Sequence, residues 1–539
     1  MFPAIPSWRV APSFVILATI MLSACAVGPD FERPPAPNVQ SYEPTPLPEK
    51  TIAVNTPGGA AQAFIPDGVI PAEWWKLFHS EPLNRLIARS LQANPDLAAA
   101  EAALREAHEN AAAGYGLLLP SVDSGFNVTR QRVPGAVSGG TGSPPPFTVY
   151  NASVSVSYGL DVFGGARRYI EALTAAEEFQ AFELEAARLS LTGNVVTTAI
   201  REASLRAQIA ATRRIIDDEK QSLDLLQKQF DLGAIAKSPV LAQAATLAQT
   251  RATLPPLEKD LAQTRHLLSV LAGQLPSVAP EGKFELASLT LPKKLPVSVP
   301  SRLVEQRPDI RAAEASLHAA SAEIGVATAN MLPQFDITGD IGTVATALSG
   351  LGGPASLIWS LAGGITQPLF HGGELLHRRR ASEAAFDQAA AVYRKTVLTA
   401  FQDVADSLRA LQSDAEALKA SAEAERAARE SLNLSRQQYK EGAISYLSLL
   451  DAQRTAQQAK IALVQAQAQR YADTAALFTA LGGGWWNRAE AVEPSISPGE
   501  GTQPDPGSPV DLRAQKNDGA DTAPVKIVNF NLKNNSAGE

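Results

Sequence analysis

The sequence predicts a mixed α and β protein made of two similar halves, and three observations support that prediction. Short motifs recur in the same order in both halves. Segments of roughly ten residues alternate between apolar and polar side chains, which is the period of a β-strand with two different faces. Two very long stretches contain no proline, as uninterrupted helices require. Each half is therefore expected to combine strands with a pair of long helices.

Composition excludes several classes of protein. At 539 residues the chain exceeds one ordinary compact core, and 45% hydrophobic residues with a mean hydropathy of −0.05 exclude both wholesale disorder and a polytopic helical membrane protein. The net charge of −8 has the wrong sign for a nucleic-acid-binding surface. A single cysteine excludes a disulfide framework, a cysteine-based zinc site and an iron–sulfur cluster. Most enzyme classes fit this composition poorly.

The first 25 residues predict export and a lipid anchor. A single positive charge precedes an apolar run, Phe14–Leu22, that is too short to span a bilayer as a stable helix. The only cysteine, Cys25, follows Leu22-Ser23-Ala24, which resembles the bacterial lipobox. We therefore expect a signal peptide over residues 1–24 and acyl and diacylglyceryl lipid on Cys25, with an ordinary buried cysteine as the alternative. Ala26, in place of aspartate, favours sorting to the outer membrane.

An internal duplication is predicted by motifs that recur at a nearly constant offset. Three pairs of motifs follow the same order: Asn94-Pro95-Asp96-Leu97 and Arg307-Pro308-Asp309-Ile310, Leu119-Pro120 and Leu332-Pro333, and Phe230–Ile235 and Tyr439–Ile444. Chance similarity of alanine-rich helices could produce one such match, but hardly three in register. We expect a first repeat over residues 82–273, beginning with a helix, and a second over 301–482.

Four segments have the alternation of β-strands. They lie at about 121–131 and 147–163 in the first repeat, and at about 334–343 and 356–369 in the second. Their length suits strands that cross a membrane, with lipid on one side and water on the other. A soluble sandwich with a wet face is the alternative. Because four strands cannot close a barrel and open edges are not tolerated in lipid, copies of the chain would have to supply the rest.

Long helical hairpins account for most of the remaining sequence. The proline-free stretches from 165 to 233 and from 373 to 442 would each form a helix of roughly 100 Å. A 4-3 spacing of apolar residues in the second predicts left-handed coiled-coil packing, through Val397, Phe401, Val404, Leu408, Leu411, Ala415, Leu418 and Ala422. Turns near 233 and 442 return the chain along 240–271 and 447–481. Pro255-Pro256 is expected to interrupt the first return helix.

At this point the chain resembles the TolC/OprM-like outer-membrane factors, in particular their lipoprotein efflux branch (NodT-like). The motifs behind the resemblance are Cys25-Ala-Val-Gly-Pro-Asp-Phe, Ala72-Glu73-Trp74-Trp75, Gln306-Arg307-Pro308-Asp309-Ile310, Gln367-Pro368-Leu369-Phe370, Gly442–Leu447, Leu450–Arg454 and Ala480–Trp485. Together they extend from Cys25 to about Trp486. No single motif is decisive, but their order and spacing make the match specific.

The resemblance implies a trimer in which each protomer adds four strands to a twelve-stranded transmembrane barrel. A long α-helical coiled-coil barrel would continue it into the periplasm, with an equatorial domain drawn from 25–81, 274–300 and 483–539, the last ending in a disordered tail. It implies a non-enzymatic exit duct for drugs or other toxic solutes, served by a periplasmic adaptor (membrane fusion protein) and an inner-membrane RND-type pump, without cofactor or nucleic acid. The alternatives are a duct for type I protein secretion and a periplasmic adaptor lipoprotein.

The resemblance also implies a periplasmic gate near the turn of the second hairpin. Asp451 matches the family's pore-lining aspartate, and Tyr439 matches its gate tyrosine. Three aspartates in a ring would repel one another and select cations. Gln438 stands where relatives often have arginine, and Asp231 is a further candidate because it lies beside the equivalent turn. A solvated surface position is the plainer interpretation of Asp451.

Both turns are expected to dock the adaptor. Leu232-Gly233-Ala234 resembles the family's small hydrophobic tip motif, and Gly442-Ala443 is its counterpart, with the charged Glu441 in the apolar position. Helix capping by the two glycines is the plainer interpretation and is compatible with docking. No metal site is expected, because His371 and His377 are not at the i, i+4 spacing of a helical metal pair.

Overall fold

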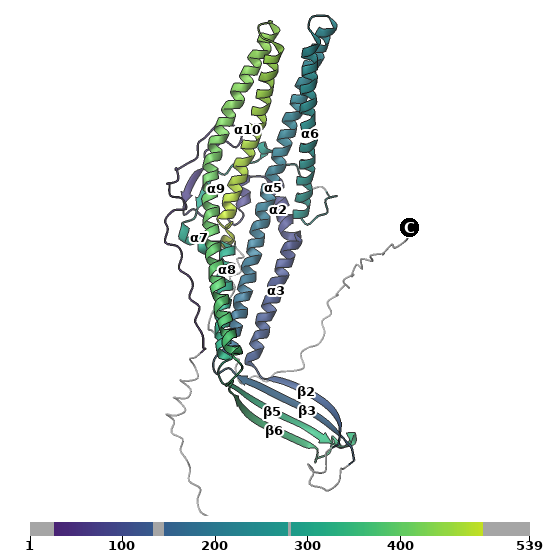
Figure 1. Ribbon diagram of the computed structural model, residues 1–539, viewed down its shortest axis with the longest axis vertical. Coiled ribbons are helices and arrows are strands. Elements are labelled where there is room, and N and C mark those ends of the chain that lie inside the picture. Colours follow the sequence, from purple (N-terminus) through teal and green to yellow (C-terminus); the bar gives the residue numbers. More distant parts are fainter. Residues whose placement is uncertain (1–25, 133–144, 279–281, 489–539) are drawn as a thin grey trace, which may run out of the picture. The chain divides into compact units, whose positions relative to one another are not determined.

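The computed structural model describes residues 26–132, 145–278 and 282–488, in which long helices accompany a curved sheet (Figure 1). The prediction of a mixed α and β chain is confirmed. The predicted signal segment, its cysteine Cys25 and the tail from 489 lie outside the described residues. Among the described residues, no helix is both long and apolar enough to cross a bilayer.

The first helical region divides into two helices where a single one was predicted. These are α2 (Glu81–Ala93) and α3 (Pro95–Tyr115), followed by the 3-10 turn η2 (Gly116–Leu118). Asn94 is extended, and its side chain accepts hydrogen bonds from the backbone N–H of Asp96 and Leu97. Because this side chain caps a new helix with proline at its first position, the chain stops one helix and starts another at Asn94.

Four strands form one antiparallel sheet in the order β2-β3-β5-β6. They are β2 (Ser121–Gln131), β3 (Phe147–Leu160), β5 (Gln334–Ala345) and β6 (Leu357–Thr366). β3 ends three residues before its expected end because Asp161 accepts hydrogen bonds from the next helix, at the N–H of Ala166 and Arg167. β6 ends at Thr366, before Pro368, which has no N–H to donate to a neighbouring strand.

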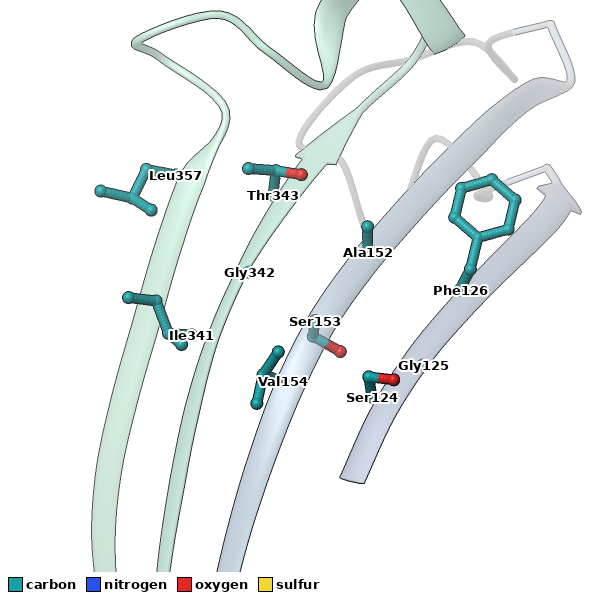
Figure 2. A pocket seen from close by; sticks show the side chains of 10 residues that line it. All are labelled: Ser124, Gly125, Phe126, Ala152, Ser153, Val154, Ile341, Gly342, Thr343 and Leu357. Carbon is teal, nitrogen blue, oxygen red and sulfur yellow. The ribbon is translucent and has the colours of Figure 1, made fainter. Parts of the chain in front are cut away.

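The register gives the sheet one continuous apolar face. Val122 pairs with Val156, Val154 with Ile341, and Ile341 with Trp359, so apolar side chains lie beside one another across all four strands. Figure 2 shows this part of the sheet from close by, where an open hollow of about 650 Å³ follows the strands.

The opposite face of the sheet is polar. Asp340 on β5 accepts hydrogen bonds from Ser155 on β3 (2.5 Å) and from Ser360 on β6 (3.3 Å). The alternation expected from the sequence therefore separates two chemically different faces.

Two helical hairpins of matching dimensions follow the two pairs of strands. The first consists of α5 (Gly165–Asp231) and α6 (Lys237–Leu271), and the second of α9 (Glu374–Lys440) and α10 (Tyr446–Ala480). Each has a helix of 67 residues and a return helix of 35. α8 (Pro308–Ala329) packs against both α5 and α9.

The prediction that two prolines interrupt α6 was wrong. Pro255 and Pro256 both lie inside the continuous helix Lys237–Leu271. Each lacks a backbone N–H and so removes a helical hydrogen bond, but both prolines are exposed. The packing of α6 against α5 on either side of the pair keeps the chain helical.

The coiled-coil seam predicted in α9 is buried. Val404, Leu408, Leu411 and Leu418 are each 0% exposed, whereas Phe401 is only partly buried. Val404, Leu408 and Leu411 belong to a large core in which Trp74 stacks on Phe478, with ring centroids 5.4 Å apart.

A small parallel sheet lies beside this core and was not predicted. Its strands are β1 (Ala63–Pro66) and β4 (Lys294–Val297), from the two segments expected to form an equatorial domain. The shorter elements are η1 (Trp74–Phe78), η3 (Leu286–Ser288), α7 (Pro300–Gln306), η4 (Leu348–Gly350) and η5 (Trp485–Asn487). Four-residue strands with proline at one position show too little alternation to be recognised from sequence.

Candidate functional site at the helical turns

Both hairpins end in the same backbone turn. Gly233 and Gly442 have φ values of +73° and +74°, and each directly follows the C-cap residue of its long helix. The N–H of Ala234 donates to the carbonyl of Gln229, and that of Ala443 donates to the carbonyl of Gln438, both at 2.8 Å. This is the Schellman motif, in which a left-handed residue satisfies the last helical carbonyls. The capping role of both glycines is therefore real.

The residues around the two glycines are exposed. Leu232 is 84% exposed, and Ala234, Glu441 and Ala443 are exposed as well. Because the leucine side chain is not buried within its own chain, its apolar surface is available to contact another molecule.

Behind the turns, an apolar cluster joins the two hairpins. Tyr446, Leu449 and Leu450 from α10 pack with Leu226 of α5 and Val240 of α6, and all five are buried. This group is called the tip cluster below. It brings the first and second hairpins together close to their turns.

Tyr439 borders the tip cluster. Its ring meets that of Tyr446 edge-on, with centroids 5.5 Å apart. Burial raises the pKa of Tyr439 above its ordinary value. The structure therefore brings the predicted gate tyrosine into contact with Tyr446, which was not a predicted site residue.

A chain of buried polar groups continues from Tyr446 across the hairpins. Its hydroxyl donates to the amide oxygen of Gln243, whose Nε2 donates to the carbonyl of Glu219 at 3.0 Å. Burial, followed by the neighbouring Tyr439 and Glu219, raises the pKa of Tyr446 far above its ordinary value. The hydroxyl therefore stays protonated and remains a donor.

Glu219 is the next member of this polar chain. It is 1% exposed, and its Oε1 accepts hydrogen bonds from Thr250 (2.9 Å) and from Gln457 (2.6 Å). Its other oxygen has no partner among the described residues. Glu219 therefore links α5, α6 and α10 through one carboxylate.

The remaining predicted gate residues lie at the surface. Asp451 and Gln438 are exposed, and Asp231 accepts a hydrogen bond from Gln227 of its own helix at 2.8 Å. Within the described part of the chain, no hydrogen bond or ion pair joins Asp451 to Tyr439, Gln438 or Asp231. Among the described residues of one copy, the exposed carboxylate of Asp451 has no hydrogen-bond or ion-pair partner.

Sequence reasoning missed the polar residues between the hairpins. Asp218 and Arg436 form an ion pair of 3.4 Å between α5 and α9. It borders a cavity of about 140 Å³ lined by Glu219, Gln453 and Lys460, among others. A spacing of seven residues would have located Glu219, because Leu205, Thr212, Glu219 and Leu226 are all buried on α5.

The described residues contain no cluster of three or more His, Cys, Asp or Glu side chains suited to a metal ion. The half-buried His318 contacts Glu171 at 3.0 Å and stacks on Phe31. These contacts position the N-terminal segment and form no metal site.

The chain matches known proteins over most of its length. A profile of the family "Outer membrane efflux protein" matches residues 86–274 and 299–483. The pyoverdine export outer membrane protein OpmQ of Pseudomonas putida is 30% identical over 452 residues, which cover 82% of this chain and 94% of OpmQ. The toluene efflux pump outer membrane protein TtgF of Pseudomonas putida is 32% identical over 489 residues, or 88% of this chain and 96% of TtgF.

Solved structures have the same fold. The outer-membrane channel OprN matches with a TM-score of 0.76 and 29% identity, over 86% of this chain and 100% of that chain.

Proposed function

The chain belongs to the family of outer membrane efflux proteins, and from this membership we propose that it is the outer-membrane exit duct of a tripartite efflux system. The duct receives drugs or other small toxic solutes from a periplasmic adaptor and an inner-membrane RND-type pump. Its relatives are named for export and efflux rather than for an enzymatic reaction. The energy comes from the pump, so the duct needs no catalytic residue.

The single observation that carries the proposal is the combination of two long hairpins with a two-faced, four-stranded sheet. The periplasmic adaptor considered above would have one hairpin between lipoyl-like β segments, and this chain has two. The sheet has two open edges, β2 and β6, which lipid does not tolerate. Three copies would close a twelve-stranded barrel, and their hairpins would continue it as a coiled-coil tunnel.

The domain limits follow from this assembly. The two repeats, 82–273 and 301–482, each supply two strands and one hairpin. The segments 25–81, 274–300 and 483–539 would form the equatorial belt and the tail. Lipid on Cys25 would attach the protein to the outer membrane in addition to the barrel. More than one acyl chain is needed for such an anchor to be stable.

The turns are proposed to have two roles. Leu232-Gly233-Ala234 and Gly442-Ala443 would dock the adaptor through their exposed surface. Asp451, with Tyr439, Gln438 and Asp231 nearby in sequence or at the equivalent turn, would form the periplasmic gate. The exposed carboxylate of Asp451 supports this role, because three copies around one axis would repel one another and attract cations.

Single-channel currents in planar bilayers test the duct and its gate together. The wild-type protein is expected to give small, flickering currents that enlarge in Asp451→Ala. Asp406→Ala is the matched control, because Asp406 is an exposed aspartate of the same hairpin far from the turn in sequence. Equal currents in all three proteins would remove Asp451 from the gate. No current from a correctly folded, inserted trimer would overturn the duct itself.

A further inference from the structure

The middle of the second hairpin contains two carboxylates that face each other. Asp414 on α9 and Asp473 on α10 lie within hydrogen-bonding reach of each other. Asp414 Oδ2 is buried, and none of the described residues supplies it with a hydrogen-bond donor. Two ionised carboxylates have only acceptor atoms, so the contact between them requires a proton on one of the two.

A buried arginine lies beside the pair. Arg470 is 0% exposed, and its Nη2 donates to Thr51 Oγ1 (2.7 Å) and to the carbonyl of Ala60 (3.0 Å). Its Nε and Nη1 have no partner in the described part of the chain. Arg470 therefore donates to neutral groups and forms no direct ion pair with Asp414 there.

The balance of forces on Asp414 favours its neutral form. Burial and the neighbouring Asp473 together raise the pKa of Asp414 to about 8, although the charge of Arg470 acts in the opposite direction. These two are the charged groups that act on Asp414. The N-terminal segment contributes the hydroxyl of Thr51 and the carbonyl of Ala60 to Arg470, and Gln469 donates to Asp473 Oδ2 at 2.9 Å.

The first hairpin has helices of the same length and no acid pair at the equivalent positions. Glu374 follows Gly165 by 209 residues, and Tyr446 follows Lys237 by the same number. The positions equivalent to Asp414 and Asp473 are therefore Leu205 and Thr264, both buried in α5 and α6.

We infer that Asp414 and Asp473 form a proton-binding site between α9 and α10, and that this proton makes the packing of the second hairpin sensitive to pH. With the proton bound, one carboxyl donates to the other across the helix interface. After its release, two like charges face each other in a partly buried site, and repulsion loosens the contact between the two helices.

The direction of the pH effect follows from linkage. The pKa of Asp414 in the folded protein, about 8, is above its ordinary value of 3.8. Between these two pH values the folded state binds more protons than the unfolded state, so stability falls as the pH rises. The stability that the pair contributes is fully present below the ordinary pKa of 3.8 and is lost as the pH rises through the folded-state pKa.

Infrared spectroscopy of the purified, full-length trimer tests the site directly. The wild-type protein is expected to show the carbonyl band of a protonated carboxyl group at neutral pH, and this band should titrate away near pH 8. The band should be missing from both Asp414→Asn and Asp473→Asn, because an amide donor replaces the proton in each. Asp406→Asn, an exposed carboxylate on α9, should leave the band unchanged.

Thermal unfolding provides the second measurement. The unfolding temperature of the wild-type protein should fall between about pH 6 and about pH 9, and Asp414→Asn should lose most of that fall. The double variant Asp414→Leu, Asp473→Thr copies the first hairpin and should be equally insensitive. A wild-type protein without the band, or a band that survives both single variants, would overturn the inference. So would a fall in unfolding temperature that is the same in all variants.

Discussion

At the scale of single residues, one hydroxyl group joins the two hairpins near their turns. Tyr446 of α10 donates to Gln243 of α6, and Gln243 is 0% exposed. A buried amide oxygen that loses its donor cannot turn to water, so this hydrogen bond matters more than an exposed one. Tyr439 is a natural comparison, since its ring lies against Tyr446 while its hydroxyl makes no hydrogen bond within the described residues.

Tyr446→Phe is therefore expected to lower the free energy of unfolding by about 1–3 kcal/mol, the cost of leaving a buried polar group unpaired. In planar bilayers the same variant should open more often, because one link between the hairpins is lost. Tyr439→Phe is the control for stability and should change the free energy of unfolding by no more than a few tenths of a kcal/mol. Equal destabilisation by both variants would mean that ring packing, and not the hydroxyl, holds the hairpins.

At the scale of elements, the two turns share a backbone but differ in side chain. Both end in a Schellman motif around a glycine with positive φ. The position before the glycine is Leu232 in the first turn and Glu441 in the second, and both are exposed. Because neither side chain is packed within the chain, the two can be exchanged without disturbing the fold.

Leu232→Glu should weaken adaptor binding to the first turn and leave thermal unfolding unchanged. Glu441→Leu should strengthen binding to the second turn, because it restores an apolar tip. Affinity for the purified adaptor, measured for the two variants and the wild-type protein, tests both expectations. If Leu232→Glu binds as well as the wild-type protein, the first turn serves only to cap its helix.

At the scale of the whole molecule, the two faces of the sheet determine how the chain meets the membrane. Ile341 lies on the continuous apolar face and is 56% exposed, and Thr338 lies on the polar face of the same strand. An apolar face of this extent on a single copy is covered by lipid in the proposed trimer, and the polar face lines the water-filled interior.

Ile341→Arg is expected to impair insertion, since an arginine on the lipid face near the bilayer centre costs about 2–4 kcal/mol. Thr338→Arg, on the same strand but facing the interior, should insert normally and reduce cation selectivity. Heat-modifiable mobility of outer-membrane fractions would measure insertion, and reversal potentials would measure selectivity. Equal insertion of the two variants would contradict the assigned faces.

Much of the fold was determined by local sequence patterns. Alternation of side chains located all four strands of the sheet to within a few residues, and the absence of proline located α5 and α9. These signals are local, because the period of a strand or helix is written in adjacent residues. The same locality explains the errors, since Pro255 and Pro256 favour a break that only the packing against α5 prevents.

The site was predicted less completely than the fold. The turns and Tyr439 could be located from motifs, but Gln243 and Glu219 could not be connected with Tyr446. Tyr446 and Gln243 are separated by 203 positions, and Glu219 and Gln457 by 238. A single sequence contains no information about which distant side chains meet, because helix rotation and hairpin spacing decide it. The sequence by itself thus determined the elements and the turns, and the tertiary structure decided which polar groups lie buried between the hairpins.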